Sequence, residues 1–117
     1  MKQILSAFDY LHKKDIVHRD VKMENVMIDA SFNVKIIDFG FSVKLTKGEV
    51  LYDFCGTPHY IPPEVIKKKG YYGKEADVWS LGILLYRLAV GNFPFKGINE
   101  KNLFNKIAKG ELKIAPE

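Results

Sequence analysis

The segment from Ala76 to Val90 constrains the fold of this chain more than any other part of it. Its apolar residues lie on nearly every side of a helix: Val78, Trp79, Leu81, Ile83, Leu84, Leu85, Tyr86, Leu88 and Val90. A helix with this pattern is buried either in a protein core or in a membrane. The segment is too short to span a bilayer and carries Asp77 and Arg87. It therefore predicts a core helix around which the rest of the chain folds.

Two elements are predicted before this helix. Apolar residues within 4–11 recur at helical spacing, which predicts an amphipathic helix. The apolar runs 26–28 and 34–37 are separated by a polar connection at 29–33, which predicts a β-hairpin.

The remaining segments differ strongly in regularity. Residues 40–63 have no sustained period and contain several glycines and prolines, so we expect one long irregular segment, of a kind that is usually functional. Asn99 predicts the N-terminal cap of a last short helix that ends at Lys109, before Gly110. This order of elements predicts an α+β fold dominated by helices.

The net charge of +4 comes from lysines that are scattered along the chain. The only run is Lys67–Lys69, and because Gly70 follows it, the run is better explained as the end of a helix. We therefore expect neither a nucleic acid nor a membrane as a partner.

Length and cysteine content limit the number of domains and the cellular compartments that are compatible with this chain. Its 117 residues allow one domain or part of one. The single cysteine, Cys55, cannot form an internal disulfide, which favours a reducing compartment. Because no uninterrupted apolar region follows Met1, a signal peptide is not predicted. We expect a cytoplasmic location, with the nucleus also open.

Two short strings carry the residues best suited to catalysis: HRDVKMEN at 18–25 and DFG at 38–40. The side chains of Asn25 and Asp38 offer the oxygen ligands that Mg²⁺ prefers beside substrate phosphates. Asp20 would then be free to accept a hydroxyl proton, and Lys22 could neutralise charge on a phosphoryl group. Two carboxylates beside apolar strands are costly unless they are paired or bind a metal.

Three further strings follow in order: GTPHYIPPE at 56–64, DVWSLG at 77–82 and GNFPF at 91–95. Together with the first two, they resemble the C-terminal lobe of a eukaryotic protein kinase of the serine/threonine type. The strings around Cys55 and Phe93 most resemble calcium/calmodulin-dependent and AMP-activated kinases. The resemblance implies that residues 1–117 form a partial kinase domain with the catalytic loop, the DFG segment, the activation segment and the following helices.

The resemblance also implies an enzyme that uses ATP and Mg²⁺ and phosphorylates serine or threonine hydroxyls of protein substrates. Asp20 would be the catalytic base, and Lys22 would contact the γ-phosphate. The implied nucleotide-binding residues are Lys22, Glu24, Asn25, Met27 and Asp38. Of these, Asn25 and Asp38 would hold the magnesium ions, and Met27 would lie under the adenine ring.

Other residues have implied structural or regulatory roles. The structural residues are His18, Phe39, Glu64 and Asp77, of which Asp77 would hold the backbone of the catalytic loop. Thr57 resembles a residue that bridges Asp20 and Lys22 and favours serine or threonine substrates. Arg19 resembles an arginine that pairs with a phosphate on the activation segment. Because Asp53 stands where such kinases commonly carry a threonine, we expect it to supply Arg19 with a fixed negative charge.

The chain departs from the family pattern at several positions. Pro62 replaces the usual alanine before Pro-Glu, and Met23 replaces a common proline. Position 62 needs an extended residue, which proline before proline favours. Glu24 resembles a glutamate that meets basic substrate residues in some kinases, but Arg87 stands where some of those kinases carry a second acid. The arginine that usually pairs with Glu64 has no counterpart in these residues.

The proposed roles have simpler alternatives. On spacing alone, Asp77 could be a helix cap, Met27 could fill the core, and His18 could be a hydrogen-bonded, half-buried histidine. A zinc site is another alternative, with the ligands Cys55, His12, His18 and His59. Zinc is disfavoured because no pair of these residues has a finger-like spacing.

These 117 residues contain no Gly-x-Gly-x-x-Gly string and no lysine in a Val-Ala-Ile-Lys-like strand. Both features belong to the N-terminal lobe, which covers the nucleotide. We therefore expect a fragment that is inactive alone, because catalysis requires a positioned nucleotide. The expected partners are protein substrates and regulatory proteins. A non-catalytic binding or regulatory fragment and a truncated gene product are the alternatives.

Overall fold

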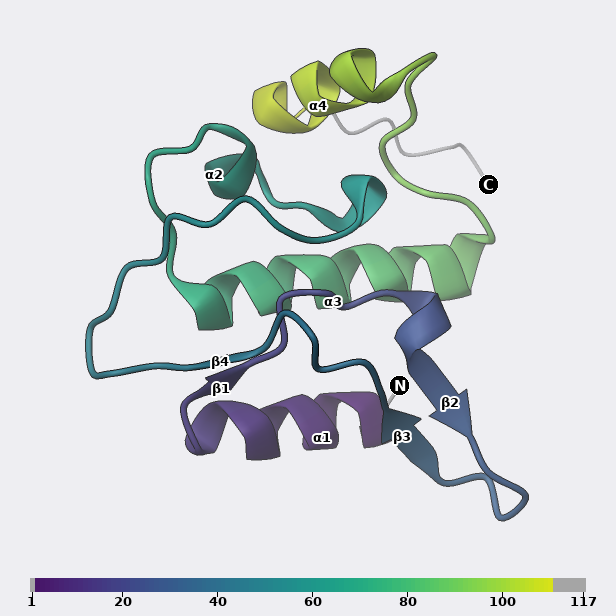
Figure 1. Ribbon diagram of the computed structural model, residues 1–117. Helices are drawn as coiled ribbons and strands as arrows, with labels where there is room; N and C mark the ends of the chain where they lie inside the picture. Colours follow the sequence, from purple (N-terminus) through teal and green to yellow (C-terminus); the bar gives the residue numbers. More distant parts are fainter. Residues whose placement is uncertain (1, 111–117) are drawn as a thin grey trace.

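The computed structural model describes residues 2–110 of the chain, so residues 1 and 111–117 of the expected partial domain lie outside the described part. It combines helices with short strands (Figure 1). In chain order the elements are α1 (Lys2–Lys13), β1 (Ile16–Val17), η1 (Met23–Asn25), β2 (Val26–Ile28), β3 (Val34–Ile36), β4 (Val43–Lys44), η2 (Pro58–Tyr60), α2 (Pro63–Ile66), α3 (Gly73–Val90) and α4 (Glu100–Lys109). The mixed composition agrees with the predicted α+β class.

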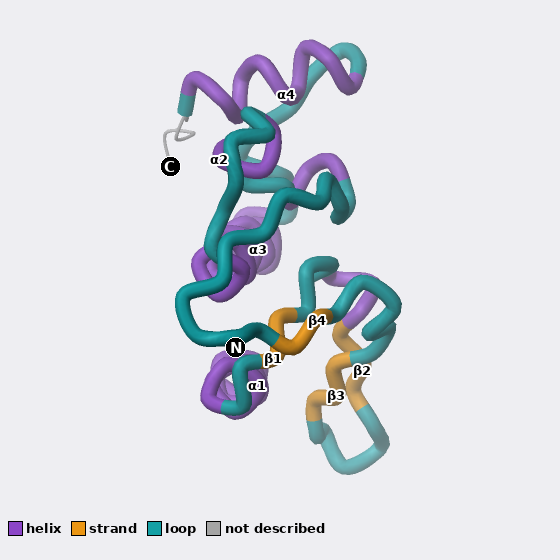
Figure 2. Tube along the Cα trace, turned by 60° about the vertical axis from the view of Figure 1, so that its left-hand side comes forward, coloured by secondary structure: helices purple, strands orange, loops and turns teal. Residues whose placement is uncertain are grey.

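Helix α3 crosses the middle of the molecule, with α1 on one side and α2 and α4 on the other (Figures 1 and 2). The main core joins residues of α1, η2, α3 and α4 with neighbouring loops: Ile4, Phe8, Val21, Tyr60, Leu81, Ile83, Leu84, Phe95, Leu103 and Ile107. Gly91 ends α3 in the left-handed conformation, at φ 88°, and its N–H donates to the carbonyl of Arg87 at 2.8 Å. The predicted central helix is confirmed and begins three residues earlier than expected.

The prediction that α3 is buried on nearly every side is wrong. One face carries the exposed residues Val78, Leu85 and Leu88, and the exposed fraction of Val78 is 60%. Val90 is exposed as well, at the last residue of the helix. Hydrophobic pattern alone predicted burial all round, but burial requires a neighbour on each side. No element within residues 2–110 covers this face of the helix.

The hairpin is confirmed, with β2 and β3 antiparallel and Val26 opposite Ile36. Its turn is closed by Asp29, whose Oδ1 accepts hydrogen bonds from the N–H groups of Ser31 and Asn33 at 2.9 Å. The hydrogen bond from Asn33 is the main reason why the pKa of Asp29 is lowered. Gln3 of α1 donates to the carbonyl of Phe32 and accepts from the N–H of Val34, which docks the hairpin on α1.

The segment 40–63 is more ordered than expected. Residues 43–44 form β4, which pairs antiparallel with β1, and residues 58–60 form the turn η2. Strands of two residues are too short to show an alternating pattern, which is why the sequence did not indicate them. The pairing of β1 with β4 brings the segment after the DFG string beside the segment that leads to Asp20.

The C-terminal predictions are confirmed. Oδ1 of Asn99 accepts a hydrogen bond from the N–H of Asn102 at 2.8 Å and so caps α4, which ends at Gly110 in the left-handed conformation. The lysine run follows the short helix α2, with Lys67 at its C-cap. None of the helices within residues 2–110 is long and apolar enough to cross a membrane.

Candidate active site

Asp20 lies in the loop between β1 and η1, and only 6% of it is exposed. Its Oδ1 accepts a hydrogen bond from the Thr57 hydroxyl at 2.9 Å. Its Oδ2 accepts one from Nδ2 of Asn25 at 3.3 Å and lies 3.8 Å from Nζ of Lys22. A buried carboxylate is tolerated when it is paired and hydrogen-bonded, as it is here. The structure thus brings together four of the residues singled out from the sequence.

Asp77 holds the backbone that precedes Asp20. It is 1% exposed and accepts hydrogen bonds from the N–H of His18 at 2.9 Å, the N–H of Arg19 at 3.0 Å and Nε2 of His12 at 2.9 Å. The alternative of a helix cap is wrong, because Asp77 lies inside α3, whose N-cap is Tyr72. Arg19 has a φ of 69°, a left-handed conformation that is costly for residues other than glycine. The two hydrogen bonds from the backbone N–H groups to Asp77 help to hold this conformation.

Asn25 and Asp38 lie at one end of the hairpin. The backbone N–H of Ile37, next to Asp38, donates to the carbonyl of Asn25 at 2.9 Å. Nδ2 of Asn25 donates to the carbonyl of Asp20 at 2.8 Å, which leaves its Oδ1 as an acceptor. Asp38 is exposed and has a left-handed φ of 58°. Both side chains therefore offer oxygens suited to Mg²⁺, and the donor set fits this ion.

His18 connects the loop to the DFG string. It is fully buried, its Nε2 donates to the carbonyl of Ile37 at 2.8 Å, and its Nδ1 accepts from the N–H of Asp20 at 3.1 Å. Its ring lies 4.9 Å from the ring of Phe39 and 6.0 Å from that of Phe8. The alternative of a hydrogen-bonded, half-buried histidine is wrong about burial, because His18 is fully buried. It is right about hydrogen bonding, because both ring nitrogens have a partner.

Met27 stands apart from this cluster. It lies on β2 and is 52% exposed, so the alternative that it fills the core is wrong.

Arg19, in the loop that carries Asp20, contacts Asp53 in the irregular segment 40–63. NH1 of Arg19 donates to Oδ2 of Asp53 and to the hydroxyl of Tyr71, each at 3.3 Å, and its Nε donates to the carbonyl of Phe41 at 2.7 Å. The hydroxyl of Tyr71 donates in turn to the carbonyl of Asp53 at 2.9 Å. Burial raises the pKa of Tyr71 to about 12, so it keeps the proton that this bond requires. The network ties residues 53 and 71 to the loop of Asp20.

Glu64 lies away from these residues. It is exposed on α2, so leaving it without an arginine carries no burial penalty in this structure. Pro62, just before it, has φ −73° and ψ 159°, which confirms the predicted extended conformation.

The side chains of the zinc alternative are each in contact with other groups of the protein. His12 contacts Asp77, His18 contacts Ile37, His59 stacks on Phe93, and Cys55 lies 3.9 Å from the hydroxyl of Tyr71. Within residues 2–110, no group of three histidine, cysteine or acidic side chains is placed to hold a metal ion.

Sequence patterns missed the contribution of Tyr60 and Arg87. The hydroxyl of Tyr60 accepts hydrogen bonds from the backbone N–H of Met23 at 3.3 Å and from NH1 of Arg87 at 3.0 Å. These residues are far apart in the chain, so spacing carried no signal for the contact.

Comparison with known proteins adds an independent observation. The model of the family described as protein kinase domain matches residues 1–116. NUAK family SNF1-like kinase 2 of Rattus norvegicus is 50% identical over 109 residues, which cover 93% of this chain and 17% of that protein. NUAK family SNF1-like kinase 1 of Homo sapiens is 46% identical over 112 residues, which cover 96% of this chain and 17% of that protein.

The chain thus spans about a sixth of the length of these relatives. Their names describe kinases, and the family match extends over the helices, the hairpin and the loops that surround Asp20. The chain therefore belongs to the protein kinase family of enzymes.

Proposed function

We propose that these residues form the C-terminal-lobe part of a serine/threonine protein kinase, which transfers the γ-phosphate of ATP to protein substrates. The observation that carries the proposal is the buried Asp20 carboxylate, held by Thr57 and Asn25 and facing Lys22. Such an arrangement suits a reaction in which catalysis is mostly positioning and charge stabilisation.

Each residue of the cluster has a definite task in this proposal. Asp20 orients the substrate hydroxyl and accepts its proton as the oxygen bonds to phosphorus and ADP leaves. Lys22, whose ammonium lies 3.8 Å from Asp20, neutralises charge on the phosphoryl oxygens. Asn25 and Asp38 would hold Mg²⁺, which screens the phosphate charge when it is bound with ATP.

The position of Thr57 and the exposure of Met27 also support the assignment. The bond from Thr57 holds the chain around residue 57 against the proposed base. The resemblance of Thr57 to a residue that favours serine or threonine acceptors supports these acceptors as substrates. Met27 and Glu24 belong to the proposed nucleotide-binding residues, and the half-exposed side chain of Met27 is accessible to an adenine ring. The single cysteine, Cys55, cannot form an internal disulfide, which supports a location in a reducing compartment such as the cytoplasm.

A chimaeric kinase tests the proposal. The matching segment of NUAK family SNF1-like kinase 2 is replaced by residues 1–117, and magnesium-dependent transfer of the γ-phosphate to serine, threonine and tyrosine peptides is measured. We expect transfer to serine and threonine that falls at least about a hundredfold in Asp20→Asn. The matched control is Asp9→Asn, because Asp9 is an exposed residue that pairs with Lys13 on the same helix, α1.

Two outcomes would contradict the proposal. Activity that persists in Asp20→Asn would exclude Asp20 as the base. A chimaera that melts cooperatively yet transfers no phosphate would favour the alternative of a kinase-like binding fragment. Residues 1–117 alone are expected to show no turnover, and Asp20-dependent turnover of this piece would refute that expectation.

A further inference from the structure

Tyr71 lies in the connection between α2 and α3 and is paired with Leu51 of the segment 40–63. The pair is an antiparallel bridge, in which the N–H of each residue donates to the carbonyl of the other, at 2.8 Å and 2.9 Å. Both side chains are buried in one cluster with Ile61, Val65 and Ala76. A buried tyrosine ring has a fixed position, from which its hydroxyl can hold a polar partner.

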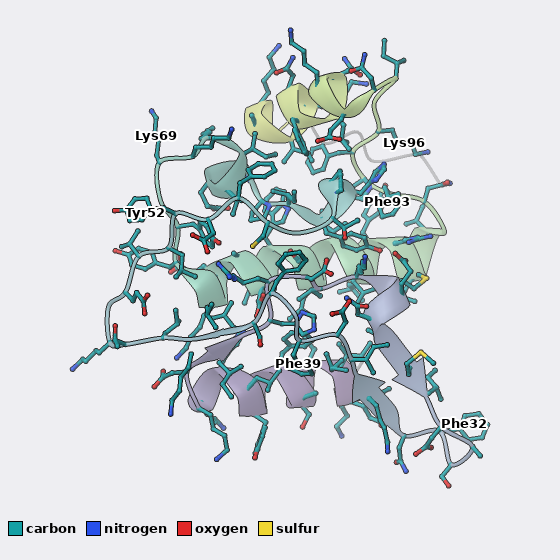
Figure 3. The ribbon with its side chains drawn as sticks, viewed as in Figure 1. Phe32, Phe39, Tyr52, Lys69, Phe93 and Lys96 are labelled. Atoms are coloured by element: carbon teal, nitrogen blue, oxygen red, sulfur yellow. The ribbon has the colours of Figure 1, made fainter. Side chains whose placement is uncertain are left out.

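The two segments approach closely because Gly70 precedes Tyr71. Gly70 has a φ of 91°, a conformation that favours glycine. A Cβ there would lie 2.8 Å from Cγ1 of Val50 and 2.9 Å from Cε1 of Tyr52. Figure 3 shows Tyr52 and Lys69 on the same side of the molecule, where the two segments meet. Any larger residue at position 70 would push them apart.

The hydroxyl of Tyr71 contacts both members of the pair formed by Arg19 and Asp53. It donates to the backbone carbonyl of Asp53 at 2.9 Å and accepts from NH1 of Arg19 at 3.3 Å. Because burial raises the pKa of Tyr71 to about 12, the hydroxyl keeps its proton at neutral pH. Tyr71 thus holds the main chain of residue 53 at the place where the carboxylate of Asp53 reaches Arg19.

The ion pair of Arg19 with Asp53 is the weaker of these contacts. Oδ2 of Asp53 lies 3.3 Å from NH1 of Arg19, and the Asp53 side chain is 73% exposed. Exposed ion pairs contribute little to stability, because water screens the charges. Removing one partner of a buried hydrogen bond costs more, because the remaining group has already lost its water. The order of the segment therefore depends more on the hydroxyl of Tyr71 than on the charge of Asp53.

The held residue is close in sequence to the candidate active site. Asp53 precedes by four residues Thr57, whose hydroxyl donates to Oδ1 of Asp20. Between them, a Cβ at Gly56 would lie 3.3 Å from the carbonyl oxygen of Arg19. A short stretch that is held at both ends has few conformations, so fixing residue 53 also limits the movement of Thr57.

We propose that Tyr71 is a positioning residue, whose hydroxyl, more than the ion pair, holds residues 51–57 against Arg19 and Asp20. The inference rests on the proposed kinase function, because the order of this segment is measured through phosphate transfer that depends on Asp20. Loss of the hydroxyl also releases Asp53, so this carboxylate contributes to activity only while Tyr71 holds it.

The kinetic test combines Tyr71→Phe with Asp53→Ala in the chimaera treated with a phosphatase. Tyr71→Phe keeps the buried ring and removes only the hydroxyl, so we expect kcat/KM to fall about tenfold, more than in Asp53→Ala. In the Tyr71→Phe background, Asp53→Ala should lower kcat/KM by less than about 1.5-fold, because the two contacts are coupled. The matched control is Tyr72→Phe, which removes a hydroxyl from the neighbouring, exposed tyrosine and should leave kcat/KM unchanged.

Hydrogen exchange separates local loosening of the segment from a general loss of stability. Tyr71→Phe should speed the exchange of backbone amides in residues 50–56 at least about fivefold, while amides of α3 exchange as before. Asp53→Ala should have a smaller effect on the same amides. A residue with only a structural role would instead lower the melting temperature and speed exchange throughout the chimaera.

The outcomes separate this inference from the proposed function. An effect of Asp53→Ala that persists in full beside Tyr71→Phe would overturn the inference, as would unchanged exchange in residues 50–56 or a general rise in exchange. Failure of the kinase function would instead appear as transfer that does not depend on Asp20 in any variant. The exchange rates would still report whether Tyr71 holds the segment.

Discussion

The hydroxyl of Thr57 donates a hydrogen bond to Oδ1 of Asp20 at 2.9 Å across 37 residues of the chain. The bond joins the irregular segment 40–63 to the carboxylate proposed as the catalytic base. Because the second oxygen of Asp20 faces Asn25 and Lys22, the Thr57 bond determines how the carboxylate is rotated.

Replacing Thr57 should therefore reduce catalysis more than stability. We expect Thr57→Ala to lower kcat of the chimaera about tenfold, because one well-placed hydrogen bond to a charged group is worth about 1.5 kcal/mol. Thr57→Ser keeps the hydroxyl and should retain most of the activity. Steady-state kinetics decide between them, with Thr46→Ala as the control, since Thr46 is exposed and its hydroxyl donates to Glu49 at 3.2 Å. Equal rates for the alanine and serine variants would show that the bond has no catalytic role.

The contact of Arg19 with Asp53 predicts activity without phosphorylation at residue 53. Asp53→Ala should lower kcat/KM about threefold or more in chimaera treated with a phosphatase. The direct energy of so exposed a pair is small, so the effect comes from the ordering of the segment. Asp9→Ala removes an equally exposed acid from α1 and should change nothing. An unaltered kcat/KM in Asp53→Ala would mean that the charge of Asp53 does not contribute to activity.

Asp77 should be the most costly of the site residues to remove. Asp77→Ala leaves two backbone N–H groups and His12 without their acceptor in a buried place. We expect the free energy of unfolding of residues 1–117 to fall by about 3 kcal/mol, measured by urea denaturation. Asp9→Ala should change it by less than about 0.5 kcal/mol. A loss as small as that for Asp77→Ala would contradict the importance of these bonds.

His59 predicts a pH dependence in the acid range. Its pKa is lowered from 6.5 by burial first and by the charge of Arg87 second. The unfolded chain therefore binds a proton at His59 more readily than the folded chain does. The stability linked to this group is complete above pH 6.5 and is lost as the pH falls from there through the folded-state pKa.

An NMR titration of the His59 ring checks this assignment. Arg87→Met should move the pKa of His59 upward, toward 6.5, because it removes the neighbouring cation. Lys101→Met removes a cation on α4 and should leave the titration unchanged. If the Arg87 variant titrates as the unsubstituted chain does, burial alone lowers the pKa.

Much of the fold was predictable because local patterns specify local structure. The hairpin, the central helix and the capped helix α4 follow from periodicity, from Asn99 and from the glycines after α3 and α4. The pairing of β1 with β4 and the open face of α3 were not predictable in this way. Both depend on which segments become neighbours, and two-residue strands carry no periodic signal.

The candidate site was likewise predictable in its residue types and not in its long-range contacts. The strings around Asp20 and Asp38 marked the residue types that suit phosphoryl transfer, and their family resemblance identified the chain as a kinase before any contact was known. The sequence also singled out Arg87 as a departure from the pattern of some related kinases. By itself, however, it could not say that the arginine meets Glu24.

The sequence by itself therefore determined which side chains are present and which local elements carry them. Only the tertiary structure decided that Thr57 contacts Asp20, that Asp77 holds the loop backbone and that Arg87 neutralises Glu24. The physical reason is that helices and turns form from neighbours in the chain, whereas these three contacts join residues 37 to 63 positions apart and exist only when the core brings their elements together.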